Sequence, residues 1–249
     1  MKQLTPRSAG TRLYCDMPLS PGAEISLPEA AARHAVTVLR LQVGDTLNLF
    51  NGEGGEYRAS LVSVSKREAR ARIIEFHATE RESPVDITLA LGISAGERMD
   101  YSLQKATELG VTAIQPLATE RSVVRLAGER ADKRLLHWQH VAIAACEQCG
   151  RNRVPLVAPV QKFFDYLAAV DRNKRLLMLS PDADAPLKRV APASAAVLLI
   201  GAEGGLSPSE FDAAQASGFE PVNLGPRILR TETAPVAALA VLQALWGDL

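Results

Sequence analysis

Two loops in the last fifth of the chain have the residue types of a ligand-binding site. An apolar run ending at Ile200 leads into Gly201-Ala-Glu-Gly-Gly205, and a second run, Pro221–Leu224, leads into Gly225. Glycine lets a ligand approach the backbone closely, and open α/β sheets bind ligands at the carboxyl ends of their strands. The two loops therefore predict one shared crevice, although a tight strand-to-helix turn would also explain the first loop.

Charges in these loops restrict the kind of ligand. Glu203 would repel a phosphate, so an adenosine hydroxyl or a cationic sulfonium is the better candidate. The second loop carries Arg227, Arg230 and Glu232. The helix dipole favours a glutamate at a helix N-terminus, but it does not favour two arginines there. A ligand or an ion pair would account for them.

The segments that must position these loops alternate between strand and helix, as in a parallel α/β sheet. Near-continuous apolar runs, which are typical of strands covered on both faces, occur at Asp86–Ser94, Thr112–Leu117, Arg175–Leu179, Ala195–Ile200 and Pro221–Leu224. Helical patterns are found at Met99–Leu109, in the long segment that ends at Gly150, and at Val236–Trp246. Ser207, Pro208 and Glu210 mark a further helix start with a capping box.

The first third of the chain has a different pattern, in which short alternating strands run from Arg12 to His77. One helix interrupts them, and Ser26 is expected to cap it. The polar stretch Ala78–Pro84 then reads as a linker. We therefore predict a small β-barrel domain at residues 1–77, a linker at 78–85 and an α/β domain at 86–249.

Composition narrows the class of protein only slightly. The chain has 249 residues, 47% of them hydrophobic, which suits a globular protein with a substantial core. Its net charge is zero, so support for nucleic-acid binding must come from local clusters such as residues 119–153. The polar N-terminus and the short apolar runs predict a cytoplasmic protein that does not enter a membrane.

The pair Cys146 and Cys149, with His137 and His140 upstream, raises the possibility of zinc. On a helix the two histidines would face away from the two cysteines, so one ion could not bind all four. No metal site is predicted.

Both glycine segments resemble signatures of one known family. Gly201-Ala-Glu-Gly-Gly and Leu224-Gly-Pro-Arg-Ile-Leu-Arg-Thr-Glu-Thr-Ala are similar to those of SPOUT-superfamily methyltransferases of the RsmE type. Further resembling blocks cover nearly the whole chain in order, namely His34-Ala-Val-Thr-Val-Leu-Arg-Leu-Gln-Val-Gly-Asp, Gln104-Lys-Ala-Thr-Glu-Leu-Gly-Val, Thr119-Glu-Arg-Ser and Glu147-Gln-Cys-Gly-Arg. Ala202 departs from the family pattern, which usually has proline there, and Arg12-Leu-Tyr is a loose match to the family's start.

The resemblance implies a small N-terminal PUA-like β-barrel and a C-terminal α/β SPOUT domain with a trefoil knot. It implies methylation of N3 of a specific uridine in 16S ribosomal RNA with S-adenosylmethionine as cofactor. The partner would be 16S rRNA or the small ribosomal subunit, and the protein would be a homodimer without membrane or metal. The apolar last helix, with Val236, Leu239, Leu242, Leu245 and Trp246, could supply the dimer contact, although burial within one subunit explains it equally well.

The resemblance also implies roles for individual residues. The catalytic pair would be Arg230, which could stabilise a uracil anion, and Glu232, with Glu203 as an alternative proton acceptor. Residues implied to bind the cofactor are Leu179, Ser180, Ile200, Gly201, Glu203, Gly204, Gly205, Leu224, Gly225, Ile228, Leu229, Arg230, Thr231, Thr233 and Ala234. Those implied to bind RNA are Arg12, Arg40, Lys105, Glu108, Arg121, Gln148 and Arg151.

Two other functions compete with this one. A Rossmann-type nucleotide enzyme shares the glycine loops, but it expects G-x-G-x-x-G in the first strand-to-helix turn, where this chain has Ala95-Gly-Glu-Arg-Met. A non-catalytic RNA-binding or assembly factor would keep the barrel but would not bind S-adenosylmethionine.

Overall fold

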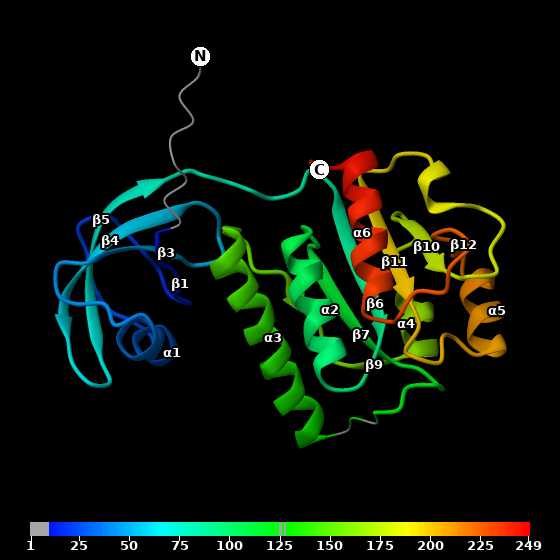
Figure 1. Cartoon of the computed structure of the whole chain (residues 1–249), viewed down its shortest axis with the longest axis horizontal. Coiled ribbons are helices and arrows are strands. Elements are labelled where there is room, and N and C mark those ends of the chain that lie inside the picture. The colour runs from blue at the N-terminus through cyan, green and yellow to red at the C-terminus, as the bar shows by residue number, and fades with distance from the viewer. Residues whose placement is uncertain (1–9, 125, 127) are drawn as a thin grey trace, which may run out of the picture. The chain divides into compact units, whose positions relative to one another are not determined.

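The computed structural model describes residues 10–124, 126 and 128–249, and the chain divides into two compact units (Figure 1). The N-terminal unit consists of Met1–Glu82 together with Cys146–Arg153. The C-terminal unit consists of Ser83–Ala145 and Val154–Leu249. The long helix α3 (Glu129–Cys149) therefore contributes most of its length to the second unit and its last turn to the first.

The N-terminal unit contains a five-stranded sheet in the order β1-β3-β4-β5-β2. Its strands are β1 (Arg12–Tyr14), β2 (Glu24–Ser26), β3 (Thr46–Phe50), β4 (Glu56–Val64) and β5 (Ala69–His77). β1 pairs with β3 in parallel, and the other pairs are antiparallel. Alternate residues such as Leu47, Leu49 and Leu61 are buried in the core of this unit, as the period of two in the sequence predicts.

A short helical segment lies between β2 and β3. It begins as α1 (Glu29–Arg33) and continues as a π-helical turn, η1 (His34–Val38). The prediction that Ser26 caps this helix is wrong. Ser26 belongs to β2, where it pairs with Arg70 of β5, and Pro28 occupies the position before the helix. Ser26 is thus used in sheet pairing and does not act as the helix cap that the local sequence predicts.

The C-terminal unit is built on a seven-stranded sheet in which the pairs are parallel. The order is β12-β10-β11-β6-β7-β8, with β9 also paired to β7. The strands are β6 (Asp86–Gly92), β7 (Ala113–Ala118), β8 (Leu156–Val157), β9 (Gln161–Lys162), β10 (Arg175–Leu179), β11 (Ala195–Ile200) and β12 (Glu220–Val222). The helices besides α3 are α2 (Glu97–Glu108), α4 (Phe163–Ala169), the 3-10 turn η2 (Leu187–Arg189), α5 (Pro208–Ala216) and α6 (Thr233–Trp246).

Helices cover both faces of this sheet (Figure 1). Ile87, Leu89 and Leu91 of β6 pack in one core with α2, α3 and α6. Ala90 of the same strand packs in a second core with α4 and α5. This arrangement confirms the predicted α/β sheet with two covered faces and explains the apolar runs of its strands.

The start of α5 agrees with the capping box in the sequence. Ser207 Oγ accepts the Glu210 N–H at 3.2 Å, and Ser207 N–H donates to Glu210 Oε2 at 2.9 Å. Pro208 is the first helical residue. The predicted capping box is confirmed.

The last helix is largely a core helix of its own unit. Leu239 and Leu242 are fully buried there, so they are not free to contact a second subunit. Val236 and Trp246 are half-buried, while Leu245 is 45% exposed. Burial within one subunit therefore accounts for the inner side of this apolar run.

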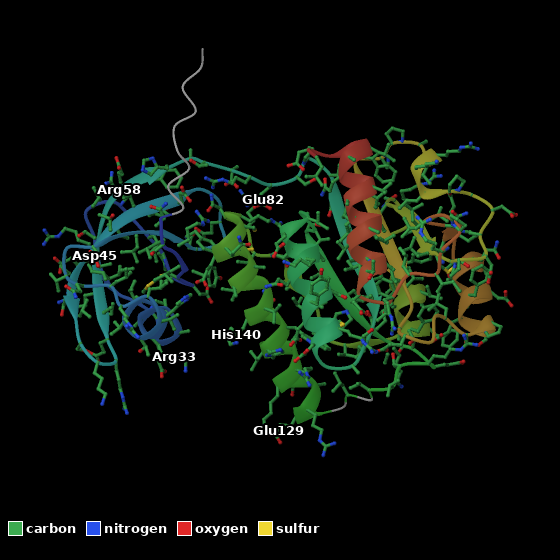
Figure 2. The ribbon with its side chains drawn as sticks, in the orientation of Figure 1. Arg33, Asp45, Arg58, Glu82, Glu129 and His140 are labelled. Atoms are coloured by element: carbon green, nitrogen blue, oxygen red, sulfur yellow. The ribbon has the colours of Figure 1, made fainter. Side chains whose placement is uncertain are left out.

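The cysteine and histidine side chains of α3 do not come together. Cys146 is buried, whereas His140 projects from the exposed side of the helix (Figure 2) and His137 pairs with Asp100 at 2.7 Å. Within the described residues, no three His, Cys, Asp or Glu side chains are grouped so that they could hold a metal ion. Of the helices in the described part of the chain, none is long and apolar enough to cross a membrane.

The carboxyl end of β6 lies directly against the first glycine loop. A Cβ atom placed on Gly92 would lie 2.8 Å from the carbonyl carbon of Gly201 and closer still to the amide nitrogen of Ala202. Because these neighbours are backbone atoms, they cannot move aside as a flexible side chain would. Gly92 is thus required by space rather than by an unusual φ angle.

We predict that Gly92→Ala destabilises the protein by about 1–3 kcal/mol or more, because it overpacks a backbone contact. Gly10→Ala is the control, since the nearest atom to its Cβ is 4.0 Å away. Chemical denaturation would measure both. Equal stability of Gly92→Ala and wild type would contradict the close approach.

Candidate active site

A cavity of about 570 Å³ lies at the carboxyl ends of β10, β11 and β12. Three segments that follow these neighbouring strands line it: Leu179–Asp182, Ile200–Pro208, and the stretch from Leu224 to Ala234. Arg121, Phe211 and Val222 complete the wall. The two glycine loops therefore share one cavity, as their positions in the sequence predict.

Most residues predicted to bind the cofactor line this cavity. They are Leu179, Ser180, Ile200, Gly201, Glu203, Gly204, Gly205, Leu224, Gly225, Ile228, Leu229, Thr231 and Ala234. Arg230 and Thr233 are exposed and are not part of the lining. The backbone explains their position, because Arg230 O accepts the N–H groups of Thr233 and Ala234 as the chain turns into α6.

Sequence reasoning missed several lining residues. They are Pro181, Asp182, Ala202, Leu206, Ser207, Pro208, Phe211 and Val222. The strand-like run that ends at Leu179 was a usable signal for Pro181 and Asp182, because they follow a strand next to β11. Arg227, noted for its unexplained charge, also lines the cavity.

The first glycine loop is a tight backbone turn. Ala202 O accepts the Gly205 N–H at 2.8 Å, and Gly205 has a φ of +68°, in the left-handed region that favours glycine. A Cβ on Gly201 would lie 2.6 Å from the carbonyl carbon of Gly205. The turn is thus closed by a backbone hydrogen bond and by the absence of side chains, without a proline at Ala202.

Glu203 joins this loop to the loop that follows β6. Its Oε1 accepts the Ala95 N–H at 2.9 Å and lies 3.4 Å from Arg98 Nη1. Its Oε2 is buried and has no hydrogen-bond partner among the described residues. Burial disfavours the charged form, but the hydrogen bonds from Ala95 and Arg98 outweigh it and lower the pKa of Glu203.

Residues of the second glycine loop also lie beside the segment that follows β6. Glu232 Oε2 lies 4.0 Å from Arg98 Nε, and the Thr231 and Ser94 hydroxyls are 3.3 Å apart. The structure therefore places Glu203 and Glu232 beside the same arginine. The sequence alone could not decide whether these two carboxylates lie close together. Arg98 was not among the predicted residues, although it lies in the first turn of α2, directly after the loop that follows β6.

The residues predicted to bind RNA have different surroundings. In the C-terminal unit Arg121 is exposed and lines the cavity, while Lys105 and Glu108 form an ion pair of 2.8 Å on α2. In the N-terminal unit Arg40 and Gln148 are exposed. These positions neither require nor exclude RNA.

Arg12 and Arg151 have structural partners inside the N-terminal unit. Arg12 pairs with Glu56 and donates to Asn152 Oδ1 at 2.7 Å. Arg151 is 4% exposed and donates to Glu82 at 2.6 Å. These buried contacts explain both arginines without RNA, because a buried charge requires a partner.

Two family models match the chain. One, described as an RNA methyltransferase domain, matches residues 81–243, and the other, an RNA methyltransferase PUA domain, matches residues 27–74. The parallel sheet with its strand-end cavity lies in the first match. The fold and the site thus define an RNA methyltransferase with a PUA domain.

Relatives of known name give a narrower result. Ribosomal RNA small subunit methyltransferase E of Buchnera aphidicola subsp. Schizaphis graminum is 34% identical, over 96% of this chain and 97% of its own length. The enzyme of that name from Bacillus subtilis is 32% identical, over 90% and 92%. The chain belongs to the ribosomal RNA small subunit methyltransferase E family. This confirms the family expected from the sequence and excludes the Rossmann-type alternative.

Solved structures agree with this result. That of ribosomal RNA small subunit methyltransferase E from Neisseria gonorrhoeae, bound to S-adenosyl methionine, has a TM-score of 0.90 and 43% identity, and covers 96% of this chain and 99% of that chain. A putative methyltransferase from Legionella pneumophila, in complex with the same cofactor, has a TM-score of 0.92 and 39% identity, with the same coverage. The PUA-like domain and α/β domain of the expected fold are confirmed.

The lowered pKa of Glu203 leads to a pH-dependent prediction. A carboxyl whose pKa is lowered by folding adds stability above its unfolded pKa of about 4.3, and that stability is lost as the pH falls through the lowered folded value. Glu203→Gln should therefore destabilise the protein at pH 7, and the difference from wild type should shrink below a pH of about 4. Thermal unfolding of both proteins across this range would measure it. A difference that grows on acidification would contradict the assigned contacts.

Proposed function

We propose that this chain transfers a methyl group from S-adenosylmethionine to N3 of a specific uridine in 16S ribosomal RNA. The observation that carries the proposal is the cavity between the two glycine loops, at the strand ends of an RNA methyltransferase domain. Relatives at 43% and 39% identity are described with this cofactor bound. The name shared by the curated relatives supports small-subunit rRNA as the substrate.

The residues of the cavity fit this cofactor. Its volume of about 570 Å³ is within the range of small-molecule sites. Ile200, Leu224 and Leu229 offer apolar surface for an adenine ring, and the glycine loops expose backbone polar groups. Glu203 adds a buried carboxylate oxygen that has no partner among the described residues and would accept a hydrogen bond or face a cation. When bound, the cofactor supplies an electrophilic methyl group on a sulfonium.

The chain itself has to orient the base, remove the N3 proton and stabilise the resulting charge. We assign Arg230 to the charge, through a charge-assisted hydrogen bond to a uracil carbonyl oxygen. Either Glu232 or Glu203 would accept the proton. We assign the proton to Glu232, because Glu203 Oε1 already accepts the Ala95 N–H and lies beside Arg98.

The other features expected of the family are part of this proposal. They are a trefoil knot formed by the two glycine loops and α6, a homodimer, and domains at residues 1–77 and 86–249 joined by a linker at 78–85. Within these bounds, Cys146–Arg153 packs in the N-terminal unit. A ribosomal RNA substrate would place the protein in the cytoplasm. The exposed Leu245 is the residue of the last helix best placed to contact a second subunit.

Mass mapping of methylated nucleotides in 16S rRNA, from cells with and without this protein, tests the activity and identifies the uridine. We expect one N3-methyluridine to disappear when the protein is absent. Binding of radiolabelled S-adenosylmethionine separates the enzyme from an assembly factor, because an assembly factor would bind none. An unchanged methylation map would overturn the proposal.

We predict that Arg230→Ala lowers turnover by about a hundred- to a thousand-fold, because it removes one charge-assisted donor from the transition state. Affinity for cofactor and RNA should change far less, since the exposed Arg230 is not part of the cavity lining. Single-turnover methylation with saturating substrates would measure the rate. Arg230→Lys is the matched variant and should recover little activity, because lysine lacks the planar fork. A near-wild-type rate for Arg230→Ala would remove the residue from the mechanism.

We predict that Leu245→Asp separates a wild-type dimer into folded monomers, because it places a charge on an exposed apolar position of α6. Leu242→Asp should instead unfold the chain, since Leu242 is fully buried. Analytical ultracentrifugation and circular dichroism would distinguish the two outcomes. A wild-type monomer at micromolar concentration would refute the dimer.

A further inference from the structure

A fully buried glutamate lies beside the cofactor cavity, and the capping box explains only half of its contacts. Glu210 is 0% exposed. Its Oε2 accepts the Ser207 N–H at 2.9 Å, which is the expected bond of the box. Its Oε1 accepts the Glu120 N–H at 2.8 Å. Glu120 follows β7 and Ser207 follows β11, so one carboxylate connects two loops that are far apart in the sequence.

The loop after β7 is itself a compact turn. The hydroxyls of Thr119 and Ser122 are 2.8 Å apart, and the Ser122 N–H donates to Thr119 O at 3.1 Å. Ser209 Oγ donates to Glu120 Oε1 at 3.3 Å, which adds a second contact from the first turn of α5. The turn is thus fixed internally and anchored to α5 through Glu120.

Arg121 extends from this turn over the first glycine loop. Its Nη1 donates to Gly204 O at 2.8 Å. A Cβ on Gly204 would lie 3.0 Å from Arg121 Cβ and 3.2 Å from its Cδ, so the arginine stem lies against the glycine. Both residues line the cavity. Arg121 therefore fixes the direction of the Gly204 carbonyl and forms part of the wall.

We propose that Glu210 is a positioning residue of the cofactor site, which holds the Thr119–Ser122 turn so that Arg121 can fix the Gly204 peptide. This inference rests on the proposed function, because it takes the cavity to be the cofactor site. Glu210 contacts backbone amides and is not among the residues that line the cavity. It acts through Arg121 and is not a catalytic residue.

Glu210→Gln is the direct test, because the amide nitrogen that replaces one oxygen cannot accept a backbone N–H. One of the two loop contacts is lost whichever way the amide turns, and a buried donor is left unpaired. The dissociation constant for S-adenosylmethionine, measured by calorimetry, should rise roughly tenfold. Without cofactor, hydrogen exchange at the Glu120 or Ser207 amide should become faster. Asp212→Asn is the matched control, as it makes the same chemical change at an exposed position of α5, and it should alter neither quantity.

A double-mutant cycle separates positioning from general stability. Arg121→Met keeps part of the stem and removes the bond to Gly204, at an exposed residue whose replacement leaves Glu210 untouched. It should weaken cofactor binding by itself. If Glu210 acts through Arg121, adding Glu210→Gln to Arg121→Met should lower the affinity for S-adenosylmethionine little further. Fully additive losses of affinity would show that Glu210 affects cofactor binding independently of Arg121, and would overturn the proposal.

The remaining outcomes are also decisive. A wild-type protein that binds no S-adenosylmethionine overturns the proposed function and this inference together. A wild type that binds, with an equal dissociation constant in folded Glu210→Gln, overturns the positioning role alone. If Glu210→Gln does not fold, Arg121→Met decides, because unchanged affinity in that variant would remove the link from the turn to the cavity.

Discussion

The site depends on a backbone contact that leaves no room for a side chain, where the end of β6 at Gly92 meets Gly201 and Ala202. Because β6 and β11 are neighbours in the sheet, the loops that follow these two strands lie together at one edge. That proximity allows Glu203 to accept the Ala95 N–H and allows Arg98 to lie between Glu203 and Glu232. The contacts that Glu203 and Glu232 make with the segment after β6 thus depend on the steric fit of β6 against the first glycine loop.

Much of this arrangement could be predicted from sequence, because its causes are local or periodic. Apolar runs gave the strands of the parallel sheet, and the capping box at Ser207 gave the start of α5. What could not be predicted depends on contacts between distant segments. Ser26 became a strand residue through pairing with β5, and Arg98 reached the site only because β6 lies beside β11. The second contact of Glu210, with Glu120, likewise cannot be predicted from a local stretch of sequence, because the two residues are far apart along the chain.

The arginines show why a motif does not by itself define a role. Arg121, Arg12 and Arg151 were all assigned to RNA by resemblance. In the structure Arg121 lies against Gly204, while Arg12 and Arg151 are held by Glu56 and Glu82, and the RNA contacts of all three stay a prediction. A match to a family motif shows only which residue type occurs at a position. Burial and contacts show whether a charged side chain is already paired within the protein or is available to a ligand.

The segment Cys146–Arg153 has a consequence for the order in which the protein can fold during synthesis. It belongs to the N-terminal unit although it is made after α2 and most of α3. Arg12 and Tyr14 both have partners in it, through Asn152 and Glu147. The first 82 residues therefore lack part of their own interior until Arg153 has left the ribosome. By then roughly three fifths of the chain has been made, so the first unit cannot be completed before β6, α2, β7 and most of α3, which belong to the second unit, have been synthesised.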